Sequence, residues 1–212
     1  MDENQINKPK ELKVILLGDS GVGKTNLINT SVGKLFEEKS SSTINATSSK
    51  INYEINGQKY EVNLWDTAGQ ERYDSITKIF LKNSEIVLFV YDITDEKSFE
   101  SLDKWIINVK EMLDNHYISA ILGNKMDLFL NENVKEEDAR DYAQSKGMKF
   151  QLVSAKDNPK IFSIFLRELI EELEGLSKYP ERVSIKLNEE KKRKKKMFLL
   201  NYCSLYIIIF FY

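Results

Sequence analysis

Short apolar runs alternate with longer amphipathic segments along the chain, and this alternation defines the expected architecture. Apolar runs bounded by turn residues predict strands, and periodic segments predict helices. Strands are expected at residues 12–17, 50–55, 59–65, 86–91, 118–123 and 149–153. Helices are expected at residues 24–32, 97–113, 135–146 and 159–175. Pro159 suits a first helical turn and Gly175 a helix stop.

The turn between the second and third predicted strands indicates how the sheet is built. Asn56 and Gly57 form the dipeptide favoured in two-residue hairpins, so this pair of strands should be antiparallel. Helices between the other strands predict parallel pairing through right-handed crossovers. We therefore expect an α/β fold, a six-stranded mostly parallel sheet with helices on both faces and one antiparallel edge strand. Ligands of such sheets bind beyond the carboxyl ends of the strands.

Composition changes this picture mainly at the two ends. Hydrophobic residues make up 42% and charged residues 30% of the 212, which is ordinary for one globular domain. We expect a flexible N-terminus at 1–10, a domain at 11–176 and a tail at 177–212. Residues 37–49 are rich in serine and threonine and should form a mobile loop. The single cysteine, Cys203, fits a reducing intracellular compartment.

The N-terminal sequence lacks two targeting signals. It has no apolar segment of the secretory type, and residue 2 is not glycine. We therefore expect neither secretion nor N-myristoylation.

A glycine-rich octapeptide follows the first predicted strand and leads into the first predicted helix. Its residues are Gly18, Asp19, Ser20, Gly21, Val22, Gly23, Lys24 and Thr25. The octapeptide matches the phosphate-binding loop pattern at every fixed position. Glycines let the backbone amides surround a phosphate at the positive end of a helix. Lys24 should reach the β- and γ-phosphates and the Thr25 hydroxyl should bind Mg²⁺, so the loop predicts a nucleoside triphosphate of undefined base.

Two later motifs resemble those of the Ras superfamily of small GTPases, a P-loop NTPase fold with a small G domain. Asn124-Lys125-Met126-Asp127 resembles its guanine-reading motif, and Ser154-Ala155-Lys156 resembles the accompanying one. A carboxylate such as that of Asp127 accepts from guanine N1–H and the exocyclic amine, and adenine offers neither arrangement. The resemblance implies that Asn124 ties the loops together and that the stem of Lys125 covers the base. It also implies that a backbone amide of the second motif meets guanine O6.

The segment Asp66-Thr67-Ala68-Gly69-Gln70 resembles the second switch of the same family. The resemblance implies that Asp66 holds the Mg²⁺ shell through water, that the Gly69 amide contacts the γ-phosphate and that Gln70 orients the attacking water. Phosphoryl transfer depends mostly on positioning and charge neutralisation, so these few groups suffice. No arginine finger is evident in the motifs, so intrinsic turnover should be slow.

Two further residues complete the expected site. Thr43 stands 18 positions after Thr25, and this spacing resembles the first-switch threonine of Rab proteins. The resemblance implies that Thr43 completes the Mg²⁺ and γ-phosphate shell, which makes it a catalytic candidate with Gln70 and Lys24. Phe36 falls where the family places an aromatic ring against the guanine. Plain core packing of Phe36 is an equally open interpretation.

Branch-level signatures most resemble those of the Rab family, at residues 65–73, 72–77 and 89–94. The resemblance implies a monomeric GTP/GDP switch in vesicle-mediated transport, without nucleic acid. It implies an exchange factor, a GTPase-activating protein and effectors, acting at the cytosolic face of a Golgi, endosome or secretory-vesicle membrane. A GTP-binding interaction module with little hydrolysis is the alternative, disfavoured by Gln70 and Thr43. Asn124 and Asp127 disfavour an adenine-using ATPase or kinase.

Two departures from the Rab pattern concern its surface. Ser48 stands where Rab proteins carry the aromatic of the effector-reading surface. Where Rab proteins carry Tyr-Tyr-Arg-Gly-Ala, this chain has Phe80-Leu81-Lys82-Asn83-Ser84. Because a bulky apolar side chain is often an interface hot spot, we expect a restricted or unusual set of partners.

The tail departs from the family as well, because it ends without a cysteine pair or a C-a-a-X box. Residues 191–196 read KKRKKK, and an apolar run at 197–212 follows. As a helix this run would span about 24 Å, short of the roughly 30 Å hydrocarbon core. Three interpretations remain open: an alternative or mistaken terminal exon, a short membrane anchor docked by the basic cluster, and palmitoylation or packing of Cys203. The basic run also fits a solvated spacer or a nuclear-type signal.

Overall fold

The chain divides into two units, Met1–Gly175 and Leu176–Tyr212. The computed structural model describes residues 8–38, 46–67, 80–113 and 117–175, all in the first unit. The predictions for the tail, including the basic run and Cys203, therefore lie outside the described residues.

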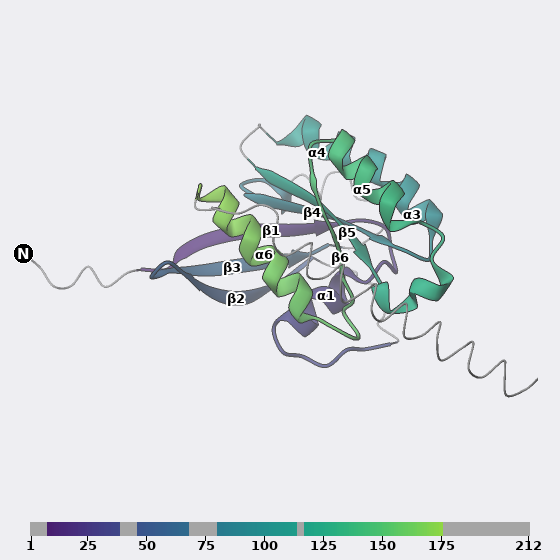
Figure 1. The fold of residues 1–212 in the computed structure, drawn as a ribbon. Helices are drawn as coiled ribbons and strands as arrows, with labels where there is room; N and C mark the ends of the chain where they lie inside the picture. Colours follow the sequence, from purple (N-terminus) through teal and green to yellow (C-terminus); the bar gives the residue numbers. More distant parts are fainter. Residues whose placement is uncertain (1–7, 39–45, 68–79, 114–116, 176–212) are drawn as a thin grey trace, which may run out of the picture. The chain divides into compact units, whose positions relative to one another are not determined.

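Six strands form a single sheet in the order β2-β3-β1-β4-β5-β6 (Figure 1). The strands are β1 (Lys10–Leu17), β2 (Thr47–Ile55), β3 (Gln58–Asp66), β4 (Ile86–Asp92), β5 (Ile118–Asn124) and β6 (Lys149–Leu152). β2 pairs antiparallel with β3 through a turn at Asn56 and Gly57, both with positive φ. All other neighbours are parallel. The sheet confirms the predicted α/β class with one antiparallel edge.

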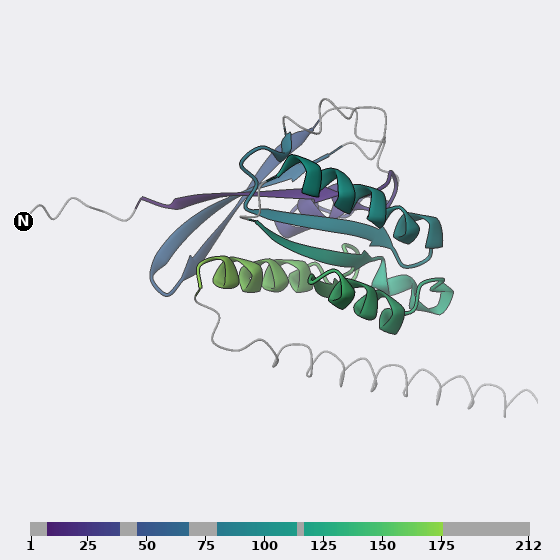
Figure 2. The ribbon, with the colours of Figure 1, turned by 90° about the horizontal axis from the view of Figure 1, so that it is seen from above.

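Helices cover both faces of this sheet. They are α1 (Lys24–Ser31), α3 (Glu96–Glu100), α4 (Leu102–Met112), the 3₁₀ helix η1 (Met126–Asn131), α5 (Glu136–Ser145) and α6 (Lys160–Leu173). Seen from above, α4 and α6 lie on opposite sides of the central strands (Figure 2). Within the described ranges, every helix is too short or too polar to traverse a bilayer.

Side-chain alternation along the strands separates the core into two layers. Ile15 and Leu17 of β1 and Phe89 of β4 belong to the layer that packs against α4 and α5. Val14 and Leu16 of β1 point to the opposite face, where α1 contacts α6. The two layers hold the sheet rigidly, so the loops at its carboxyl edge project from a fixed base.

Three differences from the predicted elements have local causes. The expected helix at 97–113 is two helices, divided at Ser101. The Ser101 hydroxyl and the Ser101 amide both donate to the Lys97 carbonyl, and such back-bonding by serine often bends a helix. η1 begins within the guanine motif, at Met126, without an apolar period that would have predicted it. Residues 47–49 were expected to be loop, but they extend β2 because β3 continues to Asp66 and offers them backbone partners.

Candidate nucleotide-binding site

Four predicted motifs and one further residue, Asp92, lie at the carboxyl ends of five strands. Gly18 directly follows β1, Asp66 ends β3, Asp92 ends β4, Asn124 ends β5, and Ser154 comes two residues after β6. These strands are neighbours in the sheet, so motifs spread over most of the chain gather at one edge.

Two glycines of the octapeptide are required by the close approach of the loop to the sheet. A Cβ on Gly18 would lie 2.1 Å from the carbonyl oxygen of Val90, and Gly18 has φ +145°. A Cβ on Gly23 would lie 2.4 Å from Asn124 Nδ2, and Gly23 has φ +94°. Gly23 also caps α1, so the helix begins at Lys24 and presents its positive end to the loop.

Lys24 is a buried cation inside this loop. Its side chain is 5% exposed, and Nζ donates to the carbonyl oxygens of Gly18 at 2.7 Å and Asp19 at 2.8 Å. Burial lowers the pKa of Lys24 to about 8, against the opposing effect of the Asp66 and Asp19 charges. A desolvated ammonium among backbone carbonyls gains from an anion, so the loop is arranged to receive phosphate.

Two side chains with oxygen atoms that could bind a metal ion lie beside the loop, where Mg²⁺ is expected. The Thr25 hydroxyl donates to Asp66 Oδ2 at 2.7 Å, and Asp66 is 3% exposed. Thr67 holds this strand end in place by donating to the Leu16 carbonyl at 2.7 Å. Among the described residues no group of three or more histidine, cysteine or acidic side chains gathers for a metal. One carboxylate and one hydroxyl fit Mg²⁺, which prefers a few protein oxygens together with phosphate and water.

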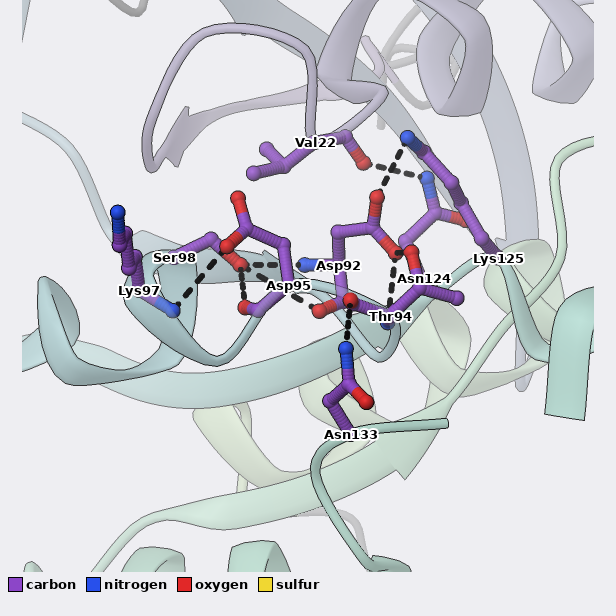
Figure 3. Close-up of polar contacts among 9 residues, drawn as sticks. All are labelled: Val22, Asp92, Thr94, Asp95, Lys97, Ser98, Asn124, Lys125 and Asn133. Atoms are coloured by element: carbon purple, nitrogen blue, oxygen red, sulfur yellow. Dashed lines mark hydrogen bonds and ion pairs between the residues drawn. The ribbon is translucent and has the colours of Figure 1, made fainter. Parts of the chain in front are cut away.

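Asn124 connects the base-reading motif to the phosphate loop. Its Nδ2 donates to the Val22 carbonyl oxygen at 2.8 Å (Figure 3). Its Oδ1 is buried without a hydrogen-bond partner in the described part of the chain. The contact joins two segments 102 positions apart, so the predicted base-reading motif and the phosphate loop are held against each other.

The carboxylate of Asp127 is held by the second guanine motif. The buried Ser154 hydroxyl donates to Asp127 Oδ1 at 2.6 Å and accepts from the Asp157 amide at 2.9 Å. Ala155 is buried beside it. Because both motifs follow neighbouring strands, the expected acceptor for guanine N1–H is oriented before any base is bound.

Phe36 lies near the second motif and outside the hydrophobic core. It is 36% exposed, and Lys156 Nζ lies 5.9 Å from its ring centroid. Asn26 fixes this segment by two hydrogen bonds to the backbone of Glu37, at 2.9 and 3.2 Å. Core packing of Phe36 is therefore wrong, and its contact with guanine stays a prediction.

Asp92 is a member of the site to which sequence analysis gave no role. Its Oδ2 forms an ion pair with Lys125 Nζ at 2.6 Å (Figure 3). Its Oδ1 accepts from the amide and hydroxyl of Thr94 at 2.9 and 2.8 Å. Lys125 has a left-handed backbone, with φ +64°. The available signal was an acidic residue ending a fully apolar strand, at the edge where ligands bind.

Replacing Asp92 with asparagine is expected to weaken GDP binding about three- to tenfold, because a neutral side chain no longer holds the Lys125 ammonium in place. Equilibrium binding of GDP measures the change. Asp95→Asn is the matched control, since the Asp95 side chain caps α3 and accepts from Lys97 instead. Equal affinities for the Asp92 variant and the parent would contradict this role.

Three of the predicted residues fall outside the described ranges. Thr43, Gly69 and Gln70 all lie there, so their roles stay predictions. Ser20 and Gly21 are exposed on the phosphate loop, as a surface for ligand requires.

Comparison with known proteins agrees with this geometry. Residues 13–174 match the Ras family. Rab-21 of Geodia cydonium is 40% identical over 154 residues, which cover 73% of this chain and 67% of that protein. Human Rab-21 is 38% identical, covering 73% and 68%, and human Rab-30 is 34% identical, covering 73% and 76%.

A phosphate loop and a guanine motif on this sheet define a GTP-hydrolysing small GTPase, and the chain belongs to the Ras family. Within that family it is a Rab-type protein. This membership implies guanine nucleotide binding, the usual regulators and a role in vesicle trafficking.

Proposed function

We propose that this chain is a Mg²⁺-dependent GTP/GDP switch that binds effectors in its GTP state. The observation that carries the proposal is the arrangement of Lys24 and Asp127 at one sheet edge, one for phosphate and one for base. Asn124 bonds the two loops together, and Ser154 orients the Asp127 carboxylate.

Some side chains of this chain bind the nucleotide and the metal, and others position the attacking water. Lys24 would contact the β- and γ-phosphates, and Thr25, together with Asp66 acting through water, would hold Mg²⁺. The metal supplies charge neutralisation on the phosphate oxygens. Thr43 and the Gly69 amide contact the γ-phosphate side, and Gln70 orients the water that attacks it. Loss of the γ-phosphate releases the segments bearing Thr43 and Gln70, which ends effector binding.

Single-turnover hydrolysis of GTP by the purified chain tests the catalytic part of this proposal. We expect a slow intrinsic rate that Gln70→Leu lowers at least about tenfold, since positioning of water is lost. A hydrolysis rate indistinguishable between the parent and the variant would contradict the role of Gln70. Tight GTP binding without turnover, even with a GTPase-activating protein, would favour the interaction module instead.

Replacing Thr25 with asparagine is expected to weaken GTP binding and its dependence on Mg²⁺. Asparagine lacks the hydroxyl that lies 2.7 Å from Asp66 Oδ2, and its amide oxygen is one bond further from the backbone, so the oxygen proposed to bind Mg²⁺ is displaced. We expect about a tenfold or larger loss of GTP affinity at millimolar Mg²⁺, and a smaller loss for GDP. Thr30→Asn in the last turn of α1 is the control. If GTP affinity and Mg²⁺ dependence match the parent's, Thr25 has another role.

The surface that would meet effectors lies on the antiparallel edge of the sheet. Ser48 is paired with Trp65 in the β2–β3 register and is exposed. Trp65 packs against Phe80, with ring centroids 5.4 Å apart, and Lys13 Nζ lies 5.0 Å from the Trp65 ring. A hydroxymethyl group beside Trp65 offers much less apolar area than an aromatic ring. We propose that this chain binds a restricted set of partners.

Effector binding by the GTP-locked Gln70→Leu chain tests this restriction. We expect weak binding to effectors of Rab-21 and Rab-30, and at least about tenfold tighter binding after Ser48→Phe is added. Ordinary affinity of the Ser48 chain for a broad set of Rab effectors would contradict it.

We also propose that the G domain occupies 11–176, acts as a monomer without nucleic acid and reaches endomembranes through residues 177–212. The Rab relatives and the basic run at 191–196 support the membrane part of this proposal. Intact mass of the protein from its own cells tests it. A mass that ends at unmodified Tyr212 would mean that the apolar run itself attaches the protein to the membrane. A prenylated terminus would mean that the lipid group does so instead.

A further inference from the structure

A hydrogen bond joins the phosphate loop to a helix 86 positions away. The indole Nε1–H of Trp105 on α4 donates to Asp19 Oδ1 at 2.9 Å. Trp105 is 7% exposed and belongs to the core layer between β4 and α4. Neither the phosphate contacts nor the base contacts described above use this bond.

Asp19 brings a negative charge into a loop that binds a highly negative ligand. Its backbone carbonyl accepts from Lys24, so its side chain starts close to the phosphate cradle. A carboxylate and a phosphate close to each other repel, and a low local dielectric increases the repulsion. The carboxylate must therefore be turned away from the nucleotide.

The Trp105 ring is suited to fix that direction. The indole ring has one hydrogen-bond donor and no acceptor, so it binds an acceptor oxygen only in the direction in which its N–H points. Because the ring is packed in the core, it cannot follow the carboxylate if the loop moves.

We propose that Trp105 is a positioning residue for the nucleotide site, which holds the Asp19 carboxylate away from the bound phosphates and thereby slows nucleotide release. The inference rests on the proposed guanine nucleotide site. It assigns α4 a direct link to the phosphate loop.

A double-mutant cycle on the rate of tritiated GDP release tests the proposal. Trp105→Phe frees a charged carboxylate, so we expect about tenfold faster release. Asp19→Asn keeps an acceptor for the indole and removes the charge, so its own rate of GDP release is the reference for the second background. With Asp19→Asn present, Trp105→Phe should accelerate release less than about threefold. The same tenfold acceleration in both backgrounds would show a purely structural role and overturn the proposal.

Two controls separate the possible failures. Trp65→Phe removes the other tryptophan, which packs against Phe80 and Lys13, and should leave GDP release within about twofold of the parent. If the parent chain itself fails to retain GDP, the proposed nucleotide site is wrong, whereas retention by both parent and Trp105→Phe overturns only the positioning role.

A second variant covers the case in which Trp105→Phe does not fold. Benzothienylalanine at position 105 keeps the bicyclic shape and replaces the N–H by sulfur, so the core stays filled. We expect accelerated GDP release from this variant at an unchanged unfolding temperature. Release at the parent's rate would overturn the proposal.

Discussion

Replacing Lys24 with methionine is expected to weaken GDP and GTP binding at least about a hundredfold, because two charge-assisted phosphate contacts are lost. Methionine matches the length of the lysine stem and is tolerated among buried residues, so the nucleotide-free fold should persist. Equilibrium binding measures the loss. Lys110→Met, at an exposed position of α4, should bind as the parent does. Affinity of the Lys24 variant within threefold of the parent would exclude the phosphate role.

The depressed pKa of Lys24 gives this prediction a pH dependence. The pKa is about 8 in the nucleotide-free fold and 10.5 for an exposed lysine. Between these values the unfolded chain binds more protons, so stability of the nucleotide-free fold should rise with pH there. Bound phosphate favours the charged lysine, so GDP affinity should fall by up to about tenfold per pH unit above pH 8. Lys24→Met should remove this part of the slope, and an unchanged slope would assign it to another group.

Replacing Asp127 with alanine is the second change with a large expected effect. Two hydrogen bonds from guanine to a carboxylate would be lost, which lowers GTP affinity about a hundred- to ten-thousandfold. ATP affinity should not change, so discrimination between the two bases collapses. Competition of each nucleotide against labelled GDP, and direct binding where GDP is no longer held, measure the ratio.

Two further variants serve as comparisons for the Asp127→Ala result, one with an intermediate expected effect and one with none. Ser154→Ala frees the Asp127 carboxylate without removing it, so an intermediate loss of about tenfold is expected. Asp138→Ala removes an exposed carboxylate in the first turn of α5 and should leave discrimination unchanged. Preserved preference for GTP in the Asp127 variant would place base recognition elsewhere.

Local sequence was sufficient for most of the fold. The strand, glycine loop and helix at 12–32 were predictable because each depends on neighbours in the chain, as was the turn at Asn56 and Gly57. The start of β2 was not, because Thr47 pairs only when Asp66 is placed opposite it. Pairing at the edge of a sheet depends on tertiary structure, so the serine and threonine content led to a wrong prediction of where β2 begins.

The same distinction holds for the site. Lys24 and Asp127 belong to contiguous motifs, which made their positions predictable. Asp92 with Lys125, and Trp105 with Asp19, are pairs that meet only after the sheet forms. The two residues of such a pair are not separated by a recognisable spacing in the sequence, so the pairing is visible only in the folded structure.

Of the chain's two tryptophans, Trp105 donates a hydrogen bond to the phosphate loop and Trp65 lies beside the predicted effector edge. Each therefore serves as a built-in optical reporter. Intrinsic emission from a Trp65→Phe chain would follow nucleotide exchange, and emission from a Trp105→Phe chain would follow partner docking. The two variants thus offer separate spectral readouts of nucleotide exchange and of partner docking, without any attached dye.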